Sequence, residues 1–252
     1  VDAKVCCSNP ALPAKQLTGR LALDGVPLDV VAPGAIAAGL DGKLTATAAF
    51  DGTGETMAAA VRAMTGTGSY TISDFSAQNF DPQAFNSLGA LTGIIDMTPE
   101  ALTAAVNEEL AKGPFASNMF TGSFTVAGGT LRSPTLAIAG SGARIFGSGN
   151  LQLADLTLDA RYAMSPTVIA DPASMVDPTT AEVTAVVTGP LWAPVASYDV
   201  ASLVDGMKIK ASEIELARLE QLRLEDEARQ RELAAERARV AAEQAAAAEA
   251  KR

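Results

Sequence analysis

Histidine is absent from the 252-residue chain, which removes the side chain most often used for catalysis and for metal binding. Without it, the serines lack the base that would activate a hydroxyl nucleophile. Carboxylates are plentiful, but Asp155 falls in an expected turn and Asp159 on the polar face of an expected strand, where aspartate is common for local reasons. We therefore expect no enzyme activity, no catalytic residue, no metal and no cofactor.

Cysteine is almost absent too, and its two copies, Cys6 and Cys7, are adjacent. Neighbouring residues rarely reach disulfide geometry, and a zinc site needs more ligands than two. We interpret both as incidental thiols in an N-terminal tail of residues 1–16. The chain is therefore not a disulfide scaffold, although this does not exclude an oxidising compartment.

Positive charge is scarce, with 19 lysines and arginines against 29 acidic residues and a net charge of −10. Binding to a phosphate backbone needs clustered Lys and Arg, so we expect no nucleic-acid partner. No uninterrupted apolar run approaches the ~18 residues of a membrane-spanning helix. Apolar residues still make up 48% of the chain, which is enough to build a core of small and aliphatic side chains.

What the chain does contain is alternation of apolar and polar residues, which predicts short strands from Leu17 onward. Gly128-Gly129 predicts a type I′ hairpin, and Gly147–Gly149 a bend. Two segments change to a helical period, at 55–64 and 98–112. The other expected features are strands ending in Asp-Gly turns at 19–25 and 41–52, a strand at 68–80, a hairpin turning at Ala154-Asp155, and a last strand at 180–189.

These patterns predict an α+β fold: a curved, mainly antiparallel sheet that carries two short packing helices, in a domain spanning residues 17–200. An internal repeat supports it. "GSYTISDFSA" at 68–77 matches "GSFTVAGGTL" at 122–131, and each copy follows an expected helix. The repeated unit therefore reads as a helix followed by a hairpin.

The C-terminal region, residues 201–252, is predicted to be a long charged helix. Glycine and proline are missing from about Ser212, and Glu213–Arg252 holds ten acidic and eight basic residues. Leu216, Leu219 and Leu222 begin an apolar stripe, but sustained heptads are missing. The pattern favours a solvated helix held by i,i+4 ion pairs over a coiled coil.

The segment Thr56–Met164 resembles the C-terminal region of the AsmA-like proteins, relatives of TamB. In that family a helix leads into "L-x-G-x-G-x-h-x-h-x-D/N-G", here "AMTGTGSYTISDF", where Asp74-Phe75 departs from the usual Asp-Gly and indicates a turn of another type. A second helix leads into the longer match "TGSFTVAGGTLRSPTLAIAGSGARIFGSGNLQLADLTLDARY", best in "ARIFGSGNLQL". "VVTGPLWAPVASYDVASL" is similar to the family's closing segment, and the charged tail has no counterpart.

The resemblance implies a periplasmic β-rich groove in a protein anchored in the inner membrane of a Gram-negative cell. It implies a role in outer-membrane assembly and lipid homeostasis, with phospholipid as partner. We expect this chain to be the C-terminal piece of such a protein. Two alternatives stay open: a structural module whose charged helix docks envelope proteins, and a secreted β-solenoid adhesin, for which the repeats are too long and irregular.

A lipid groove would be lined by apolar residues two apart on neighbouring strands, because such residues share one face. The candidates for lipid contact are Leu136, Ile138, Leu151, Leu153, Leu156 and Leu158. We expect their faces to coincide. The alternative is that helices cover the same face as an ordinary core, and composition does not separate these two arrangements.

Overall fold

In a computed structural model, the chain forms two compact units, Val1–Met207 and Lys208–Arg252. The structure describes residues 2–6, 15–31, 39–169, 171 and 173–249. Cys7 and most of the segment that joins the first two strands therefore lie outside the described residues.

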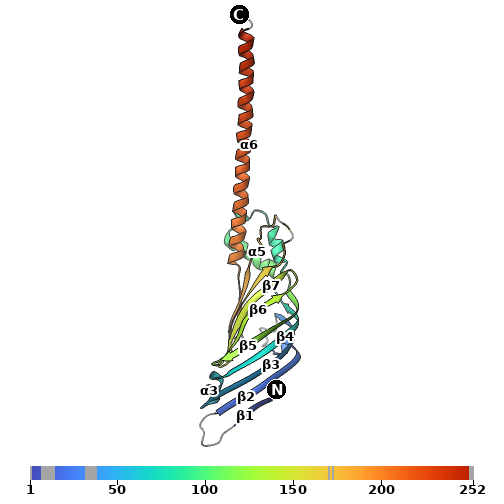
Figure 1. Cartoon of the computed structure of the whole chain (residues 1–252), viewed down its shortest axis with the longest axis vertical. Coiled ribbons are helices and arrows are strands. Elements are labelled where there is room, and N and C mark those ends of the chain that lie inside the picture. Colours follow the sequence, from blue (N-terminus) through green and yellow to red (C-terminus); the bar gives the residue numbers. More distant parts are fainter. Residues whose placement is uncertain (1, 7–14, 32–38, 170, 172, 250–252) are drawn as a thin grey trace. The chain divides into compact units, whose positions relative to one another are not determined.

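The first unit is built on one ten-stranded sheet in which each strand pairs antiparallel with its neighbours in the sequence (Figure 1). The predicted α+β class with an antiparallel curved sheet is confirmed. The strands are β1 Asp2–Cys6, β2 Lys15–Pro27, β3 Leu40–Gly54, β4 Thr65–Ala77, β5 Phe115–Ala127, β6 Thr130–Ala139, β7 Ala143–Gln152, β8 Thr157–Pro166, β9 Val183–Pro190 and β10 Val195–Asp199.

Both predicted short helices are present, and each begins at a threonine that caps it. Thr56 accepts a hydrogen bond from the Ala59 amide, and Thr98 accepts one from the Ala101 amide, as N-cap residues do. Among the residues that the structure describes, the helical segments before the C-terminal helix are α1 Leu28–Val31, α3 Met57–Arg62, α4 Ala84–Gly89, the 3-10 turn η1 Ile94–Asp96, and α5 Pro99–Leu110. The sequence did not predict α1, α4 or η1, and of these α1 and η1, with four and three residues, are too short to show a helical period.

Helices close one end of the sheet. α4 packs against α5, and Phe80 stacks on Tyr198 of β10 with ring centroids 5.7 Å apart. Figure 1 shows α5 at this end of the sheet and α3 at the other. The side chains that α4 and α5 bury are Phe85, Leu88, Leu102, Val106 and Leu110. The core of the unit therefore lies under these helices and does not extend evenly along the sheet.

Several expected turns are instead positions inside strands. β2 continues through Gly25, whose φ is 59°, and its register shifts between Leu23 and Val26. β3 likewise runs through Gly42, and the Asp51-Gly52 pair lies within it. A glycine with positive φ lets a strand carry a bulge and bend without ending. Our prediction of Asp-Gly turns was therefore wrong.

Three further strand predictions need correction. Gly147–Gly149 is not a bend, because β7 passes through it in unbroken register with β8. A strand follows the predicted last one, since β10 pairs with β9 from Val195 to Asp199. Residues 2–6 are not a tail: as β1 they pair with β2, with Cys6 opposite Gln16. β1 and β10 have only five residues each, and Gly147–Gly149 has no apolar side chain to alternate with, so none of the three was recognised as part of a strand.

The two copies of the internal repeat pair with each other. β4 and β5 run antiparallel with Ser69 opposite Ser123. The first copy is a single strand rather than a hairpin. At the Asp74-Phe75 departure there is no turn, because Asp74 adopts a φ of 54° while β4 continues to Ala77. The hairpin of the second copy is confirmed, with both turn glycines at positive φ.

The C-terminal helix α6 runs from Ala201 to Glu249, so it begins before the change of composition at Ser212. Its first turns bury Leu203, Val204 and Met207 within the sheet unit. From Lys208 onward it forms the second unit. None of the helices, over the residues described, is long and apolar enough to span a membrane.

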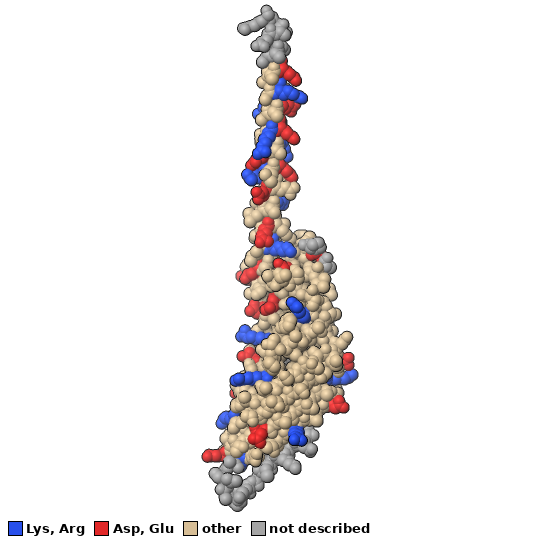
Figure 2. Space-filling model, viewed as in Figure 1, with Lys and Arg blue, Asp and Glu red and all other residues tan. Residues whose placement is uncertain are grey.

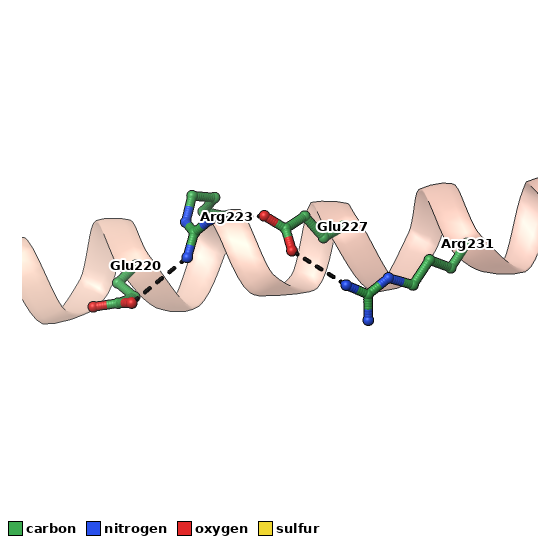
Figure 3. Close-up of polar contacts among 4 residues, drawn as sticks. All are labelled: Glu220, Arg223, Glu227 and Arg231. Carbon is green, nitrogen blue, oxygen red and sulfur yellow. Dashed lines mark hydrogen bonds and ion pairs between the residues drawn. The ribbon is translucent and has the colours of Figure 1, made fainter.

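Ion pairs connect successive turns of α6 in the second unit, as its sequence predicts. Arg223 lies 3.6 Å from Glu220 and 2.8 Å from Glu227, and Arg231 lies 3.6 Å from Glu227 (Figure 3). Figure 2 shows charges of both signs along this helix. A helix that is polar on all sides relies on such pairs, since it buries no apolar face.

Candidate functional site

One face of the sheet carries no charge from Leu17 of β2 to Gly189 of β9. We call it the inner face. Period-two geometry and the strand register place Ala46, Tyr70, Gly122, Gly147 and Tyr162 on it. The charged residues of these strand segments all lie on the outer face or at its bulges: Arg20, Asp24, Asp41, Lys43, Asp51, Asp74, Arg132, Arg144, Asp159 and Arg161.

Along β6–β9, the inner face is buried at one end and partly exposed at the other. At the helix-covered end, a row of four side chains is buried across the four strands: Ile138, Ile145, Met164 and Val183. At the opposite end, a second row is only partly buried: Leu131, Leu151, Leu158 and Gly189. The same apolar face is thus a core at one end and a surface accessible to water at the other.

Aromatic rings lie flat over glycines on this face. A Cβ atom added to Gly122 would collide with the ring of Tyr70, and one added to Gly68 would collide with Phe124. Gly147 stands in the same relation to Tyr162. A ring that lies across a neighbouring glycine covers backbone that would otherwise meet water, and it leaves a smooth apolar floor.

Three residues with hydroxyl groups lie in one part of this floor. The Tyr70 hydroxyl lies 3.4 Å from Ser133 Oγ, although the two residues are 63 positions apart. Ser133 is paired with Gly149, and a Cβ on Gly149 would lie 3.7 Å from Tyr162 Oη. Burial first, and then the neighbouring Tyr70 phenol, raise the pKa of Tyr162 to about 12. We call Tyr70, Ser133 and Tyr162 the hydroxyl cluster.

A hollow of about 760 Å³ lies beside the hydroxyl cluster, where β5 and β6 part. These strands pair only from Thr125 to Ala127 of β5, next to their hairpin. Beyond that point β5 continues beside β4 alone, and β6 beside β7. The hollow is lined from both faces of the sheet. Tyr70, Gly122, Ser133 and Leu136 belong to the inner face, whereas these lining residues lie on the outer face: Thr45, Thr47, Ser69, Thr71, Thr121 and Ser123. Tyr162 is not among the lining residues, and no charged residue is.

The predicted lipid-contact residues fall into three groups. Leu136 and Ile138 lie on the inner face, but they are buried at or near its closed end. Leu151 and Leu158 face each other across β7 and β8 and are half-buried, as a groove wall would be. Of the six predicted residues, these four therefore share one face of the sheet.

Leu153 and Leu156 do not share that geometry. Both lie in the turn between β7 and β8, so strand alternation does not apply to them. Leu156 has a φ of 54° and is 40% exposed, and its carbonyl accepts a hydrogen bond from the Leu191 amide. The turn at Ala154-Asp155 is four residues long, which moves its flanking leucines off the strands.

The sequence reading missed the hydroxyl cluster and the aromatic-glycine pairs. One signal was available: Gly-Ser-aromatic occurs at Gly68–Tyr70 and again at Gly122–Phe124. Pairing these two copies antiparallel brings each ring onto the glycine of the other. Nothing in the sequence pairs Tyr70 with Tyr162, because four strand pairings separate them.

No group of three or more His, Cys, Asp or Glu residues in the described parts of the chain could hold a metal ion. The inner face therefore offers apolar surface and neutral hydroxyls, which suits binding. No protein-family model matches this chain, and neither any curated protein nor any solved structure matches it significantly.

Proposed function

We propose that this chain is the periplasmic, lipid-handling domain of an AsmA-like protein anchored in the inner membrane, and that it supports outer-membrane assembly and lipid homeostasis. The observation that carries the proposal is the uncharged inner face, which is partly open to water along the row from Leu131 to Gly189. A closed core would bury that row, and an ordinary water-facing strand surface would carry charges.

The occupant we propose is the acyl part of a phospholipid. Burying a methylene is worth ~0.8 kcal/mol, so a 16-carbon chain exposed to water costs about 12 kcal/mol. Strands whose side chains are small or aliphatic offer such a chain a long apolar contact without a fixed shape. Glycines covered by aromatic rings, as at Gly122 and Gly147, keep that contact smooth.

The charge distribution suits the same occupant. From Leu17 of β2 to Gly189 of β9, the Lys and Arg side chains of the strands lie on the outer face, where water solvates them and where they meet no acyl chain. A phospholipid bound along the inner face would keep its charged head group beyond the open row, in water, because burying an unpaired charge is costly.

A matched pair of substitutions tests the proposal. Leu151 and Asn150 are neighbours on β7 that point to opposite faces. We expect Leu151→Glu to place a charge on the open part of the inner face and to reduce crosslinking to a photoreactive phosphatidylethanolamine by about tenfold. Asn150→Glu should leave crosslinking unchanged. Both variants should retain most of the thermal stability of the parent.

Native mass spectrometry of the purified chain gives an independent measurement. Co-purified phospholipid is the expected result. Equal crosslinking of both variants would contradict the proposal, and so would a collapsed melt for Leu151→Glu alone, which would mean that this row is a closed core.

A second candidate is a structural module that docks an envelope protein through the second unit. It is favoured by exposed leucines on α6, where Leu216, Leu219 and Leu224 are all more than half exposed. Exposed apolar side chains on a charged helix offer contacts to another helix. Replacing these three leucines by glutamine would abolish capture of such a partner and leave lipid crosslinking intact.

A further inference from the structure

We propose that the hydroxyl cluster is a binding site for the ester carbonyl of an acyl lipid, so that the inner face recognises the linkage between chain and glycerol as well as the chain. This inference rests on the proposed function. It adds a fixed point to a surface that would otherwise let an acyl chain slide.

The position of the cluster is the first argument. Among the described inner-face residues of β2–β9, polar side chains are rare, and Ser117 at the closed end is already committed, since its hydroxyl donates to the Ala139 carbonyl at 2.7 Å. Tyr70 and Tyr162 approach the Ser133–Gly149 pair from opposite sides, one from β4 and one from β8. Three residues with hydroxyl groups thus lie in one part of an apolar face.

The hydroxyls are poorly satisfied within the chain. Tyr70 and Ser133 are separated by 3.4 Å, which is long for a bond between two hydroxyls. Ser133 Oγ also lies 3.4 Å from the Pro134 carbonyl. Tyr162 Oη has no hydrogen-bond partner among the described residues. No buried side-chain nitrogen or oxygen of the described residues lacks a partner, so the Tyr162 hydroxyl is reached by water, and a lipid acceptor would replace that water with a modest net gain.

The chemistry of the site selects a neutral acceptor. A phosphate or carboxylate would need a cation, and Arg132, Arg144 and Arg161 of the neighbouring strands all project from the outer face. A tyrosine phenol has an ordinary pKa near 10 and is therefore protonated at neutral pH, and burial raises the pKa of Tyr162 further, so its hydroxyl is available as a donor. An ester carbonyl accepts such bonds and carries no charge.

Space and direction also agree. The hollow of about 760 Å³ opens where β5 and β6 part and is lined by two members of the cluster, Tyr70 and Ser133, together with outer-face threonines and serines, so a glycerol ester has room beside these two hydroxyls. From there one apolar path leads past Leu136 toward the closed end, and another leads past Leu151 and Leu158 toward the open row. An ester held at the cluster would have its acyl chain along the closed path and its head group beyond the open row.

The test compares an ester with an ether. Diheptanoyl phosphatidylcholine and its diheptyl ether analogue share chain length and head group, but only the first has carbonyls. We expect isothermal titration calorimetry to show roughly two- to tenfold tighter binding of the ester by the full chain, the range that one or two net hydrogen bonds provide. Tyr70→Phe and Tyr162→Phe keep the rings over Gly122 and Gly147 and remove the hydroxyls.

Each phenylalanine variant should weaken ester binding and leave ether binding unchanged, and the double variant should bind both lipids equally. Tyr198→Phe on β10 lies outside the cluster and is the matched control, with no expected change. Equal affinities for ester and ether in the parent, or an ester preference that survives in the double variant, would overturn the inference while leaving the proposed function standing. Failure of the parent to bind either lipid would overturn both.

Discussion

The ring of Phe124 lies across Gly68 so closely that no side chain fits at residue 68. The second copy of the repeat covers the glycine of the first, and the first covers the glycine of the second, because Tyr70 lies across Gly122 in the same pair of strands. The two copies of a Gly-Ser-aromatic motif therefore form one pseudo-symmetric unit around the Ser69–Ser123 pair.

Adding a methyl group under either ring should destabilise the sheet. We expect Gly68→Ala and Gly122→Ala each to lower the free energy of unfolding by about 1–3 kcal/mol, the usual cost of overpacking. Gly39→Ala is the matched control, because a Cβ there meets nothing within 4 Å. Urea denaturation followed by circular dichroism measures all three. Equal stability of Gly122→Ala and the control would mean that the Tyr70 ring moves freely off the glycine.

The inner face should also show a gradient of packing energy along β8. Met164 is fully buried, whereas Leu158 is half-buried on the same face of the same strand. We expect Met164→Ala to cost about 2–5 kcal/mol and Leu158→Ala less than half of that, since a truncated half-exposed side chain leaves little cavity. The comparison is made by urea denaturation. Similar losses at both positions would indicate a closed core throughout and would argue against a groove.

Alternation along the strands was enough to predict the sheet, the Gly-Gly pair to predict the hairpin at Gly128-Gly129, and helical spacing to predict both short helices, because those features depend on residues close in sequence. The prediction of Asp-Gly turns failed because the same dipeptide that closes a hairpin also forms a bulge inside a long strand, as at Gly25. The hydroxyl cluster could not be predicted from the sequence for a different reason. Tyr70 and Tyr162 are brought near each other only by the curvature accumulated over the strands between them.

Ionisation of Tyr162 should lower the stability of the folded chain as the pH rises above 10. Its pKa is raised above the ordinary value of 10 to about 12 by burial and by Tyr70. The folded state therefore keeps its proton where the unfolded state has lost it, so this contribution is complete below pH 10 and declines as the pH rises toward 12. Thermal melts across this range should fall less steeply for Tyr162→Phe than for the parent. Identical slopes would show that the phenol is already solvated in the folded chain.

The charged part of α6 should respond to the loss of one acidic side chain. Glu227 forms ion pairs with Arg223 and Arg231, whereas Glu232 has none among the described residues. Exposed pairs of this kind are worth about 0.3–0.5 kcal/mol each, and salt screens them. We expect Glu227→Gln to lower the helical signal of α6 at low ionic strength, and Glu232→Gln to change it less. In ~1 M salt the two variants should become alike. If the helical signals of the two variants already agree at low salt, ion pairing does not stabilise this helix. Burial against another chain would then have to stabilise it.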